Sequence, residues 1–138
     1  MTYDPSNIFA KILHGEIPCH KIYEDEHTLA FMDVMPQVDG HCLVLPKMAC
    51  RNLLDVDPAV LAHVMATTQK IARAVLMAFN ADGVQIRQYN EEAAGQTVFH
   101  LHFHVLPMKV SESMRPHSGK MADHGMLAKQ ADLLKSTL

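Results

Sequence analysis

Histidine and apolar residues alternate along residues 100–105, which read His-Leu-His-Phe-His-Val. Successive side chains of an extended strand point to opposite faces, whereas a helix would scatter them around its axis. Only an extended chain therefore gathers the three histidines on one face and the three apolar side chains on the other. The histidines are His100, His102 and His104, and the apolar residues are Leu101, Phe103 and Val105. A buried imidazole needs hydrogen-bond partners, so the histidine face needs a specific explanation.

The rest of the pattern predicts one α+β domain with an antiparallel sheet. A short helix is expected after Ser6 or Asn7, and a long amphipathic helix is expected to begin at Asp57-Pro58 and to end before Gly83. Strands are expected at about 20–24, 28–33, 41–45 and 84–89 and in the histidine run, and a last short helix is expected at 126–138. Three strands thus precede the long helix and two follow it.

Composition narrows the classes of partner. The chain has 138 residues and a formal net charge of −3, which disfavours nucleic-acid binding through a broad basic surface. No apolar stretch reaches the ~20 residues of a membrane span, and the N-terminus does not resemble a secretory signal. The cysteines are odd in number and lack Cys-x-x-Cys spacing. We therefore expect a soluble cytoplasmic protein with neither nucleic-acid nor membrane partners.

Three chemistries are open to three histidines on one strand face. They can ligate a metal such as zinc, they can act as nucleophile and acid–base groups at a phosphate, or they can form a solvated polar face. The residues before the run favour an anion. Gly95 can present backbone N–H groups, and Gln96, Thr97 and Asn90 add polar side chains. Donors suit a phosphate, whereas a metal needs acceptors.

The run from Gly95 to Pro107 resembles the signature of the histidine triad (HIT) superfamily, in which three histidines alternate with apolar residues. The resemblance continues in the family's order over about residues 7–107. It includes three further stretches, which are Ile8-Phe9-Ala10-Lys11-Ile12 with Gly15-Glu16-Ile17-Pro18, Tyr23-Glu24-Asp25 with Ala30-Phe31-Met32-Asp33, and His41-Cys42-Leu43-Val44-Leu45-Pro46-Lys47. We therefore treat residues 1–138 as a single HIT domain with a C-terminal tail at 108–138.

The resemblance implies a fold and an activity. HIT proteins carry a five-stranded antiparallel sheet, usually paired in a dimer into a ten-stranded one, and they cleave at the α-phosphate of a nucleoside substrate. It implies that His102 is the nucleophile, that His100 and His104 donate to phosphate oxygens, and that His41 is a supporting fourth histidine. The implied substrate is a purine nucleoside phosphoramidate or a related conjugate, hydrolysed through a nucleotidyl-histidine. A dinucleoside polyphosphate hydrolase and a non-catalytic nucleotide-binding or interaction module remain alternatives.

The resemblance also implies a substrate pocket. Asp33 matches an acidic residue that accepts hydrogen bonds from ribose. The positions that match the base-binding wall are Ile8, Phe9, Ile12, Phe31, Met32 and Val34. The residues expected near the phosphate or leaving group are Asn90, Gly95, Gln96 and Thr97.

Two departures from the family pattern argue against zinc, and no cofactor is expected. Some relatives carry a Cys-x-x-Cys pair near the first helix, where this chain has Asn7-Ile8-Phe9-Ala10. Many have a histidine soon after the Pro-Lys of the third strand, where this chain has Met48-Ala49-Cys50. A metalloprotein with the three histidines as ligands is therefore the weaker alternative. The histidines expected to be solvated are His14, His20, His27, His117 and His124.

Overall fold

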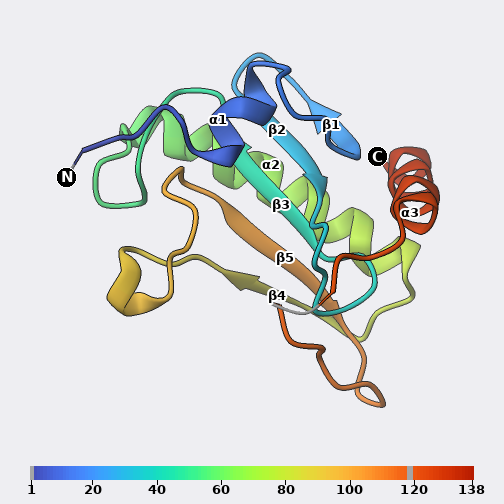
Figure 1. Ribbon diagram of the computed structural model, residues 1–138. Coiled ribbons are helices and arrows are strands. Elements are labelled where there is room, and N and C mark those ends of the chain that lie inside the picture. The colour runs from blue at the N-terminus through green and yellow to red at the C-terminus, as the bar shows by residue number, and fades with distance from the viewer. Residues whose placement is uncertain (1, 118–119) are drawn as a thin grey trace.

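The computed structural model describes residues 2–117 and 120–138. The elements along the described chain are α1 (Ile8–Leu13), β1 (Lys21–Glu24), β2 (Thr28–Met32), β3 (Cys42–Pro46), α2 (Pro58–Ala78), β4 (Gly83–Arg87), the 3-10 helix η1 (Glu92–Ala94), β5 (Phe103–Met108) and α3 (His124–Thr137). The strands form one antiparallel sheet in the order β1-β2-β3-β5-β4 (Figure 1). The predicted α+β fold with a five-stranded antiparallel sheet is confirmed.

Strand alternation divides the core into two parts. Ala30, Met32, Val44 and Val105 point to one face of the sheet, where they pack with residues of α2 and α3. The neighbouring side chains of β2 and β3 point to the other face, where they form a smaller cluster with Phe9 of α1. The first face is therefore the main core, and the second face, which is only partly covered by α1, is available to form a site (Figure 1).

Side-chain caps fix where the helices begin. Asn7, Asp57 and Asp123 each accept a hydrogen bond from a backbone N–H in the first turn of α1, α2 and α3. Pro58 follows at the first position of α2, where its missing N–H has no helical partner to lose. None of the described helices is long and apolar enough to cross a lipid bilayer.

The strand predicted for the whole histidine run begins later than expected. β5 starts at Phe103, so that His104 lies in the sheet, whereas His100 and His102 precede it. The reason is that the backbone groups of residues 100 and 101 form hydrogen bonds outside the sheet. Leu101 N–H donates to the carbonyl oxygen of Cys50, and the carbonyl oxygen of His100 accepts from the His102 side chain. The apolar side of the alternation is nevertheless correct, because Leu101, Phe103 and Val105 all belong to the main core.

Candidate functional site

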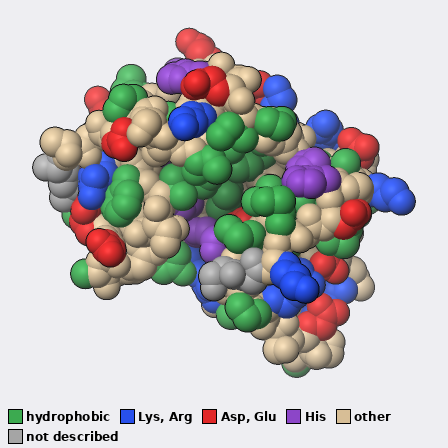
Figure 2. Space-filling view, viewed as in Figure 1, with side chains coloured by type: hydrophobic (Ala, Val, Ile, Leu, Met, Phe, Trp, Pro, Cys, Tyr) green, Lys and Arg blue, Asp and Glu red, His purple; other side chains and the backbone are tan. Residues whose placement is uncertain are grey.

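Four histidine rings form one contiguous cluster beside the end of β2 and the starts of β3 and β5. They are His41, His102, His104 and His117, and the centroids of neighbouring rings lie 5.1 to 5.4 Å apart. His104 pairs with Leu43 of β3, which places its side chain on the α1 face of the sheet. Histidine side chains are visible in a hollow of the molecular surface, surrounded by hydrophobic side chains (Figure 2).

The hydrogen bonds of His102 leave one ring nitrogen unprotonated. Its Nδ1 lies 2.7 Å from the carbonyl oxygen of His100. Because a carbonyl oxygen can only accept, Nδ1 carries the proton and the neutral ring keeps a lone pair on Nε2. Burial lowers the pKa of His102, so the ring is neutral near pH 7. His102 therefore has the form that a nucleophile requires.

A backbone amide sets the tautomers of His41 and His104 in turn. The N–H of Gln37 lies 3.0 Å from Nδ1 of His41, so this nitrogen accepts and the neutral ring carries its proton on Nε2. That Nε2 lies 2.9 Å from Nδ1 of His104 and donates to it, which leaves the His104 proton on Nε2. Burial lowers the pKa of His41 to about 4 and that of His104 to about 3. His104 thus offers a neutral N–H donor next to His102.

His100 is a supporting residue in this structure. Its Nε2 donates to the carbonyl oxygen of Pro46 at 2.8 Å, and its Nδ1 accepts from the hydroxyl of Tyr3 at 2.6 Å. Both nitrogens are therefore engaged, and no N–H remains for a phosphate oxygen, contrary to the expectation from the sequence. His100 instead holds His102 through its own carbonyl oxygen.

Asp33 and His117 form an ion pair at the edge of the cluster. The Asp33 carboxylate accepts from Met35 N–H at 2.8 Å and from His117 Nε2 at 2.6 Å, and it lies 3.3 Å from His41 Nε2. Burial alone would raise the pKa of Asp33, but the hydrogen bonds from His117 and Met35 N–H and the electrostatic interactions with His41 and His117 outweigh it, and the pKa is lowered. The same hydrogen bond raises the pKa of His117.

The prediction that His117 is solvated is wrong. The residues around it, Arg-Pro-His-Ser, carry no periodicity or motif that indicates a site. Only the tertiary path of the chain after β5 brings His117 to Asp33, 84 residues away in the sequence. Sequence reasoning had no local signal for this contact.

Gln96 fixes the loop between β4 and β5 from within. Its side-chain oxygen accepts from Asn52 Nδ2 and from Glu91 N–H, and its side-chain nitrogen donates to the carbonyl oxygens of Arg51 and Val98. The side chain is only 2% exposed, and all these bonds are internal. Gln96 therefore positions the loop. Its side-chain amide is not available to a ligand, contrary to the expectation from the sequence.

The same loop is tied to the chain before α2. Arg51 and Glu91 form a bidentate ion pair with N···O distances of 2.7 and 2.8 Å. Asn90 accepts from Leu53 N–H at 2.9 Å and also bonds the side chain of Gln88. Of the residues expected near a phosphate, Gly95 and Thr97 are exposed at the surface of this anchored loop.

Two phenylalanines form an apolar wall beside His102. The Phe9 ring contacts the His102 ring edge to face, with ring centroids 4.8 Å apart. On its other contact, the Phe9 ring packs edge to face on the Phe31 ring, with centroids 5.7 Å apart. Ile12 packs against this wall, and Ile8 is 47% exposed at its rim. Four of the six residues expected in a nucleoside pocket are thus on the α1 side.

Met32 and Val34 do not join this wall. Met32 is 1% exposed and lies in the main core, and Val34 packs against the same cluster. The reason is the alternation of β2, because Phe31 and Met32 are adjacent and so point to opposite faces. The prediction that Met32 lines the pocket with Phe31 is therefore wrong.

The cluster has the residue types of a metal site, but the tautomer of His41 does not suit one. Asp33, His41, His104 and His117 each bring one ligand atom, and these atoms lie within 4.8 Å of one another. A ligating histidine normally donates its second ring N–H to an acceptor. His41 instead accepts from Gln37 N–H, so that its cluster-facing Nε2 is protonated in the neutral ring. His41 therefore does not fit as a zinc ligand in this arrangement.

Comparison with known proteins identifies the family. The model of the HIT domain matches residues 14–110, which is more than half of the chain. The chain belongs to the HIT family. A Hit-like protein from Bartonella henselae, described as involved in cell-cycle regulation and solved with an unknown ligand, superposes with a TM-score of 0.96 and 45% identity over 100% of both chains.

Two other HIT proteins show the range of the family. Adenylylsulfatase HINT3 of Arabidopsis thaliana is 38% identical over 120 residues, which are 83% of this chain but only 61% of the plant protein. A zinc-bound HIT protein from Mycobacterium smegmatis is 35% identical, with a TM-score of 0.84 over 96% of this chain and 92% of that one. The HIT family therefore includes nucleotide hydrolases, and its fold matches that of this chain.

Proposed function

We propose that this HIT protein is a nucleotide hydrolase that cleaves at the α-phosphate of a purine nucleoside phosphoramidate or related conjugate through a nucleotidyl-His102 intermediate. The observation that carries the proposal is the hydrogen bond from His102 Nδ1 to the carbonyl oxygen of His100, which leaves Nε2 unprotonated. The Phe9 wall beside this ring supplies an apolar surface suited to a purine base.

The reaction proceeds in two displacements. The Nε2 lone pair of His102 attacks the α-phosphorus while the bond to the leaving group breaks, and the leaving group takes that electron pair and a proton from solvent. Water then attacks the same phosphorus and returns a proton to solvent, while the bond between phosphorus and Nε2 breaks and its electron pair goes back to Nε2. This step releases the nucleoside monophosphate and restores the ring. The His104 Nε2–H donates to a phosphoryl oxygen, and the carbonyl oxygen of His100 stabilises the charge on the substituted His102 ring.

The test is a pair of substitutions. His102→Ala should lower kcat for adenosine 5′-phosphoramidate by more than about 10³, since loss of one stabilising donor alone costs on the order of 10²–10³. His14→Ala, at an exposed histidine, is the matched control and should retain full activity. Mass spectrometry of the trapped reaction should find the nucleotide on His102. Full turnover by His102→Ala, with the fold intact, would refute the mechanism.

The leaving group distinguishes the related functions. Diadenosine triphosphate tests a dinucleoside polyphosphate hydrolase, and adenylyl sulfate tests the activity named for the Arabidopsis relative. Comparing kcat/KM for these compounds and the phosphoramidate identifies the preferred bond. Binding of AMP by calorimetry without turnover of any of them would favour a nucleotide-binding module.

We also propose a homodimer in which two sheets join at β4. β4 is an edge strand, and its Ile86 is 42% exposed, whereas β1 at the other edge contacts α3. Open edges with apolar side chains are sites of strand pairing. Light scattering should give the mass of a dimer at micromolar concentration, and Ile86→Glu should shift it toward the monomer. A monomeric wild-type protein would contradict the proposal.

A further inference from the structure

His117 covers a carboxylate that the proposed function needs. The Asp33 side chain is 5% exposed, whereas the side chain of His117, which donates to it at 2.6 Å, is 36% exposed. His117 therefore lies between Asp33 and solvent. The second carboxylate oxygen is occupied by Met35 N–H. A ligand hydroxyl must therefore compete with a hydrogen bond that is already formed at either carboxylate oxygen.

Hydrogen bonds to one loop hold His117 in this position. Arg115 N–H donates to the carbonyl oxygen of Gln37, and its guanidinium donates to the carbonyl oxygen of Pro36 at 3.3 Å and to Asp39 at 3.1 Å. Residues 115–117 thus lie along the connection between β2 and β3. This connection also supplies the Gln37 N–H that sets the tautomer of His41.

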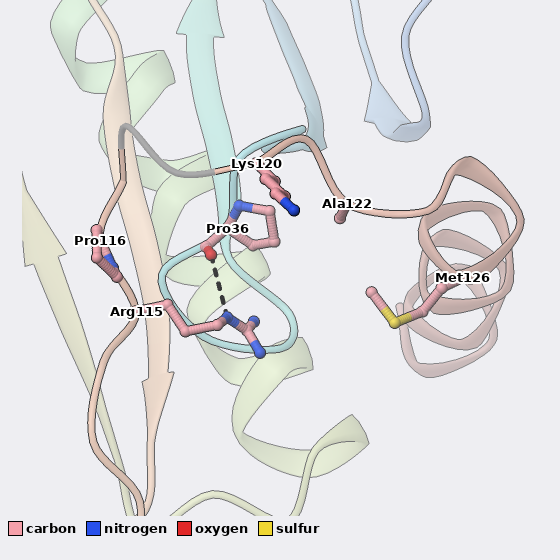
Figure 3. A pocket seen from close by; sticks show the side chains of 6 residues that line it. All are labelled: Pro36, Arg115, Pro116, Lys120, Ala122 and Met126. Atoms are coloured by element: carbon pink, nitrogen blue, oxygen red, sulfur yellow. Dashed lines mark hydrogen bonds between the residues drawn. The ribbon is translucent and has the colours of Figure 1, made fainter.

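The packing beside residues 115–117 is incomplete. A pocket of about 370 Å³ lies next to them (Figure 3). It is lined by Pro36, Arg115, Pro116, Lys120, Ala122 and Met126. Among the described residues, hydrogen bonds to the connection between β2 and β3 hold this segment, and the pocket leaves the space beside it incompletely filled. Displacement of His117 would therefore not open the main core.

We propose that His117 sets the affinity and sugar selectivity of the nucleotide site by competing with the ribose hydroxyls for Asp33. The inference rests on the proposed function, in which Asp33 accepts from the ribose. In the free protein the imidazolium takes the accessible carboxylate oxygen, and a bound ribose takes it instead. A ligand without hydroxyls does not require this exchange.

The charges around His117 favour its pairing with Asp33 in the free protein. The groups that face it are Asp33 after β2, the rings of His41 and His104, and Arg87 of β4. Burial keeps the His41 and His104 rings neutral near pH 7. Among these groups Asp33 is therefore the anion that attracts protonated His117, and Arg87 is the cation that repels it. Loss of His117 therefore removes the attraction that a ribose must replace.

The test compares AMP with 2′,3′-dideoxy-AMP by calorimetry on the full chain. His117→Ala should tighten AMP binding roughly two- to fivefold, which is the range for a partly exposed ion pair, and should leave dideoxy-AMP binding unchanged. His14→Ala is the matched control and should change neither. In a second measurement on the wild-type protein, NMR titration of the His117 ring should show its pKa fall when AMP is bound.

The outcomes separate this inference from the proposed function. Weaker AMP binding by His117→Ala, an equal change for both ligands, or a His117 pKa that AMP leaves unchanged would overturn the competition alone. If the wild-type protein binds neither AMP nor dideoxy-AMP, the nucleotide site itself is refuted, and the competition with it.

Discussion

At the scale of single residues, the chemistry of the site depends on which ring nitrogen carries a proton. Residue type alone leaves this open, because each neutral imidazole has two tautomers. Here the carbonyl oxygens of His100 and Pro46 and the N–H of Gln37 decide it for three rings. His102 consequently has a free lone pair, while His100 has no free nitrogen. Adjacent members of one alternating run thus serve different purposes.

Tyr3→Phe tests the support of His100. The change deletes the hydroxyl that donates to Nδ1 of a fully buried ring, which leaves that nitrogen without a partner. We expect a loss of about 1–3 kcal/mol in the free energy of unfolding, measured by urea denaturation. Tyr89→Phe is the matched control, since the Tyr89 ring lies near His104 but its hydroxyl makes no hydrogen bond to the described residues. Equal losses in the two variants would contradict this role for Tyr3.

The sequence predicted residues whose environment is set by local alternation or capping. Asn7 and Asp57 cap their helices as expected, and Leu101 lies in the core as expected. The environments of residues that contact segments far away in the sequence were not predicted. The contact of His117 with Asp33 and the internal bonds of Gln96 both require the folded arrangement of separate loops.

At the scale of elements, the turn between β2 and β3 delivers His41 to the cluster. Gly40, the residue before His41, has a φ of +86°, which favours glycine. A Cβ at this position would lie 2.6 to 3.0 Å from three atoms of the Phe79 ring, just beyond α2. The turn therefore packs directly on the end of α2, and the position of His41 depends on that close approach.

Gly40→Ala should be strongly destabilising. The backbone strain and the contact with Phe79 together should cost about 2–4 kcal/mol in the free energy of unfolding, measured by urea denaturation. Gly15→Ala is the control, because Gly15 has a similar φ of +79° but nothing within 4 Å of a Cβ, and it should cost about 1 kcal/mol. If Gly40→Ala loses no more free energy of unfolding than Gly15→Ala does, the contact with Phe79 does not contribute to the cost.

The order and type of the elements followed from the sequence, but some boundaries did not. The strand expected to begin before His100 begins at Phe103, because side-chain and loop partners replace the sheet hydrogen bonds of the residues before it. Met32 was also predicted on the wrong face of the sheet, although the alternation of side chains along β2 indicates the correct one. The family match placed Met32 beside Phe31 in one pocket, and the pleat separates them.

At the scale of the whole molecule, folding buries several histidines in neutral form. His41, His100 and His104 have folded pKa values of about 4, 4 and 3, and burial is the largest cause in each. In the unfolded chain each titrates near pH 6.5. His117 differs, since its hydrogen bond to Asp33 raises its pKa. The fold therefore opposes protonation of these three rings, as it does of His102, and favours protonation of His117.

This balance predicts loss of stability in mild acid. Between pH 6.5 and about 4 the unfolded chain binds protons that the three buried rings do not, so the free energy of unfolding falls as pH falls, by about 1.4 kcal/mol per pH unit for each ring. The His117 contribution has the opposite sign, being complete below pH 6.5 and lost as pH rises through its raised pKa. Urea unfolding at several pH values measures the slope, and a flat profile from pH 5 to 6.5 would contradict the prediction.

The groups that fix the protons of His100, His102 and His41 belong to the polypeptide backbone. Exchange of a neighbouring side chain cannot delete a peptide carbonyl or amide, provided that the chain path is kept. The walls around the reactive nitrogen can consequently be altered to accept a different base or leaving group while its charge state is preserved. Engineering of new substrates should therefore begin at Ile8 and Ile12, which lie outside this backbone scaffold.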